Sequence, residues 1–137
     1  MTEISPFRDA ITKSTKLTGE GSYDQSFKIL DEAIAEARGQ NNNLWTLTLC
    51  HHAAVIANFA GDVHREREYY QKSLSSNPEN PRALFGLAKV AKDAGDLEVA
   101  KQYAARCYEA ILVSDDEIIK MGLTDMVLKN WPDVVRK

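Results

Sequence analysis

Residues 47–80 read LTLCHHAAVIANFAGDVHREREYYQKSLSSNPEN, and residues 81–114 read PRALFGLAKVAKDAGDLEVAKQYAARCYEAILVS. The two stretches are equally long and align without a gap. The alignment superimposes small and aromatic residues, namely Ala54 on Ala88, Ala57 on Ala91, Ala60-Gly61-Asp62 on Ala94-Gly95-Asp96, and Tyr69 on Tyr103. Such a period, with a Gly-Asp turn between two apolar helical patterns, predicts stacked helical hairpins.

Turn and capping residues divide the chain into helical segments. Pro78 and Pro81 interrupt the pattern, because proline lacks the backbone N–H that continues a helix. We expect an all-α fold of about seven helices, at residues 6–17, 23–38, 44–60, 63–76, 81–94, 97–112 and 115–129. They form a single domain, 1–137, with hairpin units at about 7–40, 47–80 and 81–114 and a closing helix at about 115–129. The first hairpin fits the register if the loop around Asn41 holds a six-residue insertion.

Composition excludes several classes of protein. The chain has 137 residues, 44% hydrophobic and 27% charged, as in ordinary globular proteins. A net charge of −3 gives no reason to expect nucleic acid as a partner. No apolar run is long enough to span a membrane, and the N-terminus lacks the apolar core of a secretory signal, so the expected location is cytoplasmic. Cys50 and Cys107 sit in apolar helical patterns and are expected to be reduced core thiols.

The repeats resemble the tetratricopeptide repeat (TPR), a 34-residue helix-turn-helix unit. The third unit follows its pattern at Leu87-Ala88, Gly95-Asp96, Ala100 and Tyr103. The resemblance implies a short right-handed solenoid of antiparallel hairpins. Two residues depart from the pattern, since Glu66 and Ser26 stand where the second helix of a unit should carry alanine.

The resemblance also implies that the first helices of the units line a groove for an extended peptide or a partner helix. The register turns ten residues inward, which are Arg8, Ile11, Thr15, Thr48, His51, Val55, Arg82, Phe85, Lys89 and Lys92. The six expected to contact the partner are His51, Val55, Arg82, Phe85, Lys89 and Lys92. Cations around an aromatic ring favour an acidic or phosphorylated segment. The alternative is an ordinary solvated helix face.

Two further classes of function stay open. A self-associating structural module would use the closing helix, which carries more apolar residues than one stripe needs: Ile118, Ile119, Met121, Leu123, Met126, Val127 and Leu128. Trp45 and Trp131 either plug the ends of the array or mark partner contacts. A metal-dependent enzyme would have to use Cys50, His51, His52 and His64. Adjacent helical residues point about 100° apart, so His51 and His52 do not share one ion. We therefore expect a non-enzymatic adaptor for a protein or peptide, without metal or cofactor.

Overall fold

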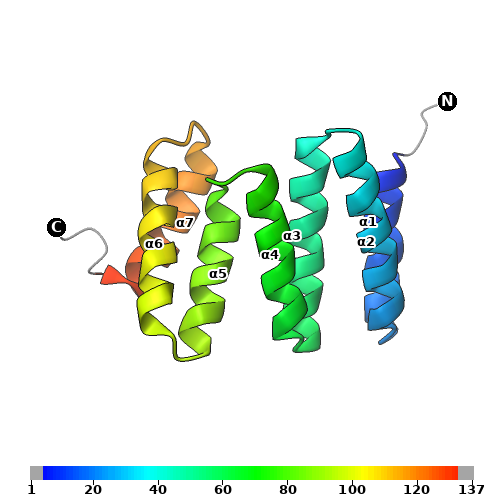
Figure 1. Cartoon of the computed structure of the whole chain (residues 1–137), viewed down its shortest axis with the longest axis horizontal. Coiled ribbons are helices and arrows are strands. Elements are labelled where there is room, and N and C mark those ends of the chain that lie inside the picture. The colour runs from blue at the N-terminus through cyan, green and yellow to red at the C-terminus, as the bar shows by residue number, and fades with distance from the viewer. Residues whose placement is uncertain (1–4, 133–137) are drawn as a thin grey trace. The chain divides into compact units, whose positions relative to one another are not determined.

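The computed structural model describes residues 5–132, and for Ile118 and Ile119 the backbone alone. The described residues form α-helices and no strand (Figure 1). The helices are α1 (Pro6–Gly19), α2 (Tyr23–Gly39), α3 (Asn43–Ala60), α4 (Val63–Ser76), α5 (Pro81–Asp93), α6 (Leu97–Leu112) and α7 (Glu117–Asn130). The all-α prediction is confirmed, and each predicted helix end lies within two residues of the observed one.

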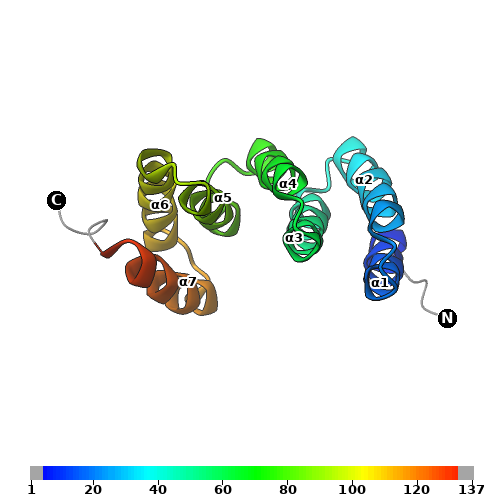
Figure 2. The ribbon, with the colours of Figure 1, turned by 90° about the horizontal axis from the view of Figure 1, so that it is seen from below.

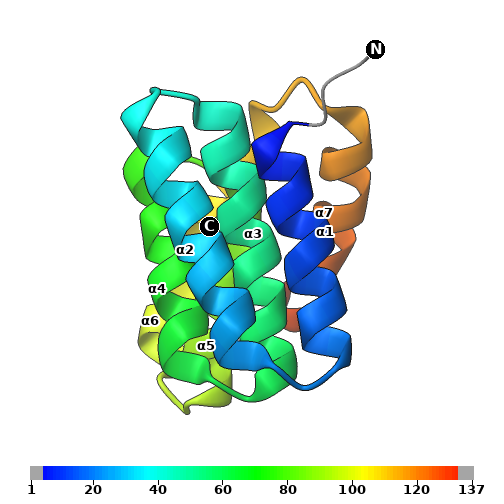
Figure 3. The same cartoon turned by 90° about the vertical axis from the view of Figure 1, so that its right-hand side faces the viewer.

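Contacts divide the chain into two compact units, Met1–Ser76 and Asn77–Lys137. In the first unit, α1 packs on α2 as an antiparallel hairpin (Figure 3), α2 on α3, and α3 on α4. Its helices α1 and α3 also touch, so they lie on one side of the unit while α2 and α4 lie on the other (Figure 2). In the second unit, α5 pairs with α6, and α7 packs on both. That residues 1–137 act as one domain remains a prediction.

The same turn joins the two helices of each hairpin. Gly61 and Gly95 adopt left-handed backbone angles, with φ of 76° and 84°, which glycine reaches without a steric penalty. The next residue closes the turn, because the N–H of Asp62 donates to the carbonyl of Ala57 at 2.9 Å and that of Asp96 to Ala91 at 2.9 Å. Each aspartate then caps the following helix through its side chain. The predicted Gly-Asp turns are thereby confirmed.

The extra residues of the first unit lie in helices, which corrects the predicted loop insertion. The segment between α2 and α3 is short, Gln40–Asn42. Instead, α2 has 17 residues against 14 in α4, and α3 has 18 against 13 in α5. Asn41 takes a left-handed φ of 55° and Asn42 accepts a hydrogen bond from the N–H of Trp45, so two asparagines suffice to end one helix and begin the next. Asparagine-rich sequence therefore marks a tight joint here.

Alanine and other small residues hold the paired helices close together. The aligned Ala54 and Ala88 have no exposed surface, and neither have Ala57 and Ala100. Larger side chains fill the remaining space in each unit, among them Leu30, Ile34, Leu49, Leu84, Ile111 and Val127. Because close packing leaves no room for larger groups at the small positions, the repeat of alanines fixes which helix faces meet.

Candidate partner-binding surface

Helix α5 carries the cations that the sequence places in a binding groove. Asn80 caps the helix through its side chain, and Pro81 occupies the first helical position, where its missing N–H costs nothing. Arg82 follows in the first turn and is exposed, and Lys89 lies two turns later, half-buried. A cation in a first turn opposes the helix dipole, so helix stability does not account for Arg82. Within residues 5–132, no carboxylate lies within 4.0 Å of either cation.

The end of α7 contacts the other two predicted residues of α5. The ring of Trp131 meets the ring of Phe85 edge to face at 6.0 Å between centroids. The Lys92 ammonium donates to Asn130 Oδ1 at 3.1 Å and lies 5.4 Å from the centre of the Trp131 ring. Trp131 is buried and thus packs as a plug, one of its two predicted readings. Among the cations of α5, Lys92 is thus engaged by the end of α7, whereas Arg82 and Lys89 form no ion pair with a described residue.

Helix α3 places His51 and Val55 on its outward side. His51 is half-buried, while half of the Val55 surface is exposed. One turn beyond Val55 lies Phe59, which is 72% exposed and which the predicted set omits. The Tyr23 ring stands beside it, 6.5 Å away between centroids. The sequence could have predicted Phe59, because it follows Val55 at the i, i+4 spacing that places two side chains on one helix face.

Helix α1 lies against α3 and contributes polar groups to the same side. Thr15 Oγ1 lies 3.3 Å from His52 Nε2, a hydrogen-bond distance between the two helices. Burial lowers the pKa of His52 from its usual value. At the start of both helices the rings of Phe7 and Trp45 pack 5.6 Å apart, so the half-buried Trp45 also contacts a ring of its own unit.

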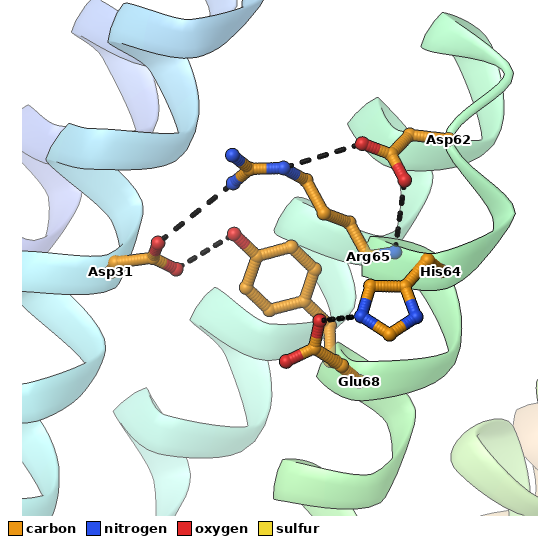
Figure 4. A network of polar contacts seen from close by, with 6 residues as sticks. Asp31, Asp62, His64, Arg65 and Glu68 are labelled. Carbon is orange, nitrogen blue, oxygen red and sulfur yellow. Dashed lines mark hydrogen bonds and ion pairs between the residues drawn. The ribbon is translucent and has the colours of Figure 1, made fainter.

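A polar network on α2 and α4 was not predicted (Figure 4). The Tyr69 hydroxyl donates to Asp31 Oδ1 at 2.7 Å, and the Arg65 guanidinium reaches Asp31 Oδ2 at 4.0 Å and Asp62 Oδ2 at 3.3 Å. The same guanidinium stacks over the Phe27 ring at 4.3 Å. These groups border an open cavity of about 320 Å³, which Lys72 and the His64–Glu68 pair also line. The carboxylates and cations here largely neutralise one another, so the network ties α2 to α4.

The two departures from the repeat pattern are accommodated by hydrogen bonds. Ser26 is fully buried, and its hydroxyl donates to the carbonyl of Ser14 at 2.9 Å. The Glu66 carboxylate, also buried, accepts from the Tyr70 hydroxyl at 3.3 Å and from the Asn58 amide at 3.4 Å. Burial, together with the adjacent Glu66 carboxylate, raises the pKa of Tyr70 above its usual value. A buried polar group in place of alanine is thus satisfied in each case.

The histidines and cysteines do not form a common site in the part of the chain that the structure describes. His64 pairs with Glu68 at 2.9 Å on α4, away from the His52 contact to α1. Residues 5–132 contain no group of three His, Cys, Asp or Glu side chains placed to hold a metal ion. Both cysteines are free thiols and fully buried, and burial raises the pKa of Cys50 to about 11 and that of Cys107 to about 12. A thiol with so high a pKa is a poor nucleophile at neutral pH.

Helix α7 has an uneven surface. Val127 is fully buried, whereas Met121 and Met126 are 71% and 45% exposed. The side chains of Ile118 and Ile119, which the sequence adds to this apolar set, lie outside those that the structure describes. Across the described part of the chain, none of the helices has the length and apolarity to cross a membrane.

Comparison with known proteins points to one family. A family model described as "Tetratricopeptide repeat" matches residues 81–111, the α5–α6 hairpin. The chain is also similar to the photosystem I assembly protein Ycf3 of Cyanophora paradoxa, at 26% identity over 125 residues, which cover 83% of this chain and 68% of that protein. The matched hairpin shares its glycine joint with the other two hairpins, and its period with the one before it. The α5–α6 hairpin is therefore identified as a tetratricopeptide repeat, and the chain as a whole resembles that family.

Proposed function

We propose that this protein is a non-enzymatic adaptor that binds an acidic segment of a partner protein. The observation that carries the proposal is the pair Arg82 and Lys89 on α5, two cations on one helix face without a carboxylate within ion-pair distance among residues 5–132. Unpaired cations on a surface attract acidic groups, and guanidinium binds carboxylate through paired hydrogen bonds. The likeness to an assembly protein supports a role in bringing proteins together.

All six residues predicted from the sequence to contact the partner are assigned a role in this proposal. Arg82 and Lys89 bind the acidic groups, while His51 and Val55 on α3 contact uncharged parts of the partner. Phe85 and Lys92 contribute through the surface that they form with Trp131 and Asn130. No catalytic step is assigned, because the histidines are engaged separately and the thiols are buried.

Charge reversal tests the proposal. The tagged protein and the Arg82→Glu/Lys89→Glu variant are used to capture partners from an extract of the source cells, and captured proteins are identified by mass spectrometry. A matched control, Arg67→Glu/Lys101→Glu, makes the same change in charge at exposed positions on α4 and α6. We expect a partner retained by the wild type and the control and lost by the α5 variant. Retention by all three proteins would refute the proposed site.

Self-association is a second candidate, favoured by the exposed Met121 and Met126 on α7. Large exposed apolar side chains on one helix are typical of an interface. Sedimentation velocity separates the two candidates, because replacing both methionines by glutamate would dissociate an α7-mediated dimer and leave an α5-mediated complex intact.

A further inference from the structure

One end of the second unit carries an open cavity. Figure 1 shows the start of α5, the end of α6 and the start of α7 together at this end. The cavity has a volume of about 410 Å³, and the residues that line it include Glu79, Leu84, Arg106, Glu109, Ala110 and Val113. We call this cavity the α5–α6 pocket. Ligand pockets begin at about 300 Å³, so its volume suits one large side chain of a partner.

The buried side chains that line the α5–α6 pocket are apolar. They are Leu84 of α5 and Ala110 of α6. Beside them, Val113 is 74% exposed, and the adjacent Leu112 is 58% exposed. The repeat pattern does not require an apolar residue at the position of Val113, because the aligned residue one repeat earlier is Glu79. An apolar surface therefore extends from the buried lining of the pocket out to solvent.

Carboxylates predominate around the α5–α6 pocket. Glu79 and Glu109 line it, and both residues are exposed. Asp115 and Asp116 follow Val113 in the turn before α7 and are exposed as well. Exposed charges act on one another over about 10 Å at ordinary ionic strength, so these carboxylates favour a cationic group next to the pocket.

The cations at this end of the unit neutralise only part of that charge. Arg106 lines the pocket, and its guanidinium donates to the carbonyl of Pro78 at 3.4 Å. Lys120 already forms an ion pair within α7. Arg82 precedes Leu84 by two residues, about 200° around α5, and therefore lies on the side of the helix opposite to the pocket. The surroundings of the pocket thus keep a net negative charge.

We propose that the α5–α6 pocket receives one large apolar side chain of a partner protein, flanked in the partner's sequence by lysine or arginine. The apolar side chain contacts Val113 and the buried lining, and the basic residues face Glu79 and Glu109. Large apolar anchors in pockets supply much of the binding energy of interfaces, and opposite charges around them add specificity. The pocket selects the charge opposite to that selected by the α5 cations, so this inference goes beyond the proposed function.

A defined peptide tests the inference on the full chain. The probe is fluorescein-labelled Gly-Ser-Lys-Trp-Lys-Ser-Gly, and companion peptides replace the tryptophan by serine or both lysines by glutamate. Dissociation constants are measured by fluorescence anisotropy for the wild type, Val113→Ser and Glu79→Lys. Leu97→Ser and Glu98→Lys are the matched controls, because both residues are exposed at the opposite end of α6.

We expect the peptide with lysine and tryptophan to bind, and Val113→Ser to weaken its binding about fivefold, because an apolar contact is lost. Glu79→Lys should weaken binding of the same peptide about threefold, the size of an exposed ion pair, and should strengthen binding of the peptide with glutamates. The two control variants should leave both dissociation constants unchanged.

The inference is overturned if the peptide does not bind, if replacing its tryptophan by serine has no effect, or if Val113→Ser and Leu97→Ser behave alike. Equal losses in Glu79→Lys and Glu98→Lys would refute the preference for basic residues. Circular dichroism checks that all variants have equal helix content, and folding is expected to survive because the four substituted residues are exposed. Every variant keeps the α5 cations, so the result is independent of the site proposed for an acidic segment.

Discussion

The Tyr69 hydroxyl donates a hydrogen bond of 2.7 Å to the Asp31 carboxylate and thereby links α4 to α2. The two residues lie in successive hairpins and are separated by a whole repeat in the sequence. Because burial and the bond to Asp31 both favour the neutral phenol, the pKa of Tyr69 rises above its usual value. The bond is thus a side-chain connection between neighbouring hairpins of the first unit.

Removing that hydroxyl should weaken the first unit. We expect Tyr69→Phe to lower the free energy of unfolding by about 1 kcal/mol, the usual net value of a hydrogen bond. Urea titration followed by circular dichroism measures the change. The aligned Tyr103 offers the control, since its hydroxyl has no hydrogen bond with any described residue and Tyr103→Phe should be nearly neutral. Equal losses in the two variants would contradict the role given to the Asp31 contact.

Two glycines of the second unit should respond in opposite ways to alanine. Gly95 has a φ of 84°, so Gly95→Ala forces a side chain into a left-handed conformation, at a cost of about 1–2 kcal/mol. Gly122 lies inside α7 with no atom within 4 Å of an added Cβ, and Gly122→Ala should stabilise by about 0.5–1 kcal/mol. Thermal unfolding of both variants tests the pair, and a gain in stability from Gly95→Ala would refute the turn geometry.

The buried thiols should make stability fall at high pH. Both thiols have an ordinary pKa of 9.0, raised in the fold to about 11 for Cys50 and about 12 for Cys107. As the pH rises above 9.0, the unfolded chain loses these protons first, so the unfolding free energy decreases by at most about 1.4 kcal/mol per pH unit and thiol. The contribution is fully present below pH 9.0 and is lost through the window that ends at about pH 11 for Cys50.

The measurement is urea unfolding at several pH values just above 9.0, before the tyrosines ionise. In Cys50→Ala the decline with pH should be shallower than in the wild type, whatever the offset in stability from the smaller side chain. Parallel declines in the two proteins would show that Cys50 does not titrate on unfolding.

Glu66 and Tyr70 should be energetically coupled. Glu66→Ala restores the alanine of the repeat pattern but leaves the buried Tyr70 hydroxyl without this acceptor, at a cost of about 1–3 kcal/mol. Adding Tyr70→Phe removes the stranded hydroxyl, so the double variant should be more stable than the sum of the single changes predicts. A double-mutant cycle in urea measures the coupling, and strict additivity would contradict it.

The repeat pattern predicted what depends on local chemistry. Gly61-Asp62 and Gly95-Asp96 identify a turn and a cap within a few residues, and both behave as expected. The same reasoning misread the residues around Asn41, because loop composition does not reveal that Asn41 and Asn42 complete a joint in three residues. Length alone could not show whether a six-residue insertion enlarges a loop or extends two helices.

For the candidate site, the sequence could predict which residues share one face of a helix, but not which side chains of other helices contact that face. The repeat register predicted that Val55, Arg82 and Lys89 line a groove, and in the structure Val55 and Arg82 are exposed while Lys89 is half-buried. It could not reveal that Trp131 and Asn130 cover Phe85 and Lys92, because that contact depends on how the end of α7 packs. The Asp31–Tyr69 bond escaped for a related reason, since it joins side chains from two repeats that the register treats separately.

In the hairpins that carry the Gly-Asp turn, the residues that form the turn come from the hairpin itself. Gly95 supplies the reversal and Asp96 satisfies the backbone of the next helix, without help from any other repeat. A stretch such as residues 81–114 therefore carries the residues that its own turn requires. Duplicating this stretch would add one hairpin to the protein without changes to the turns of the neighbouring hairpins. In this chain, a copied hairpin would bring its own turn glycine and capping aspartate, so no other substitution would be needed to form the turn.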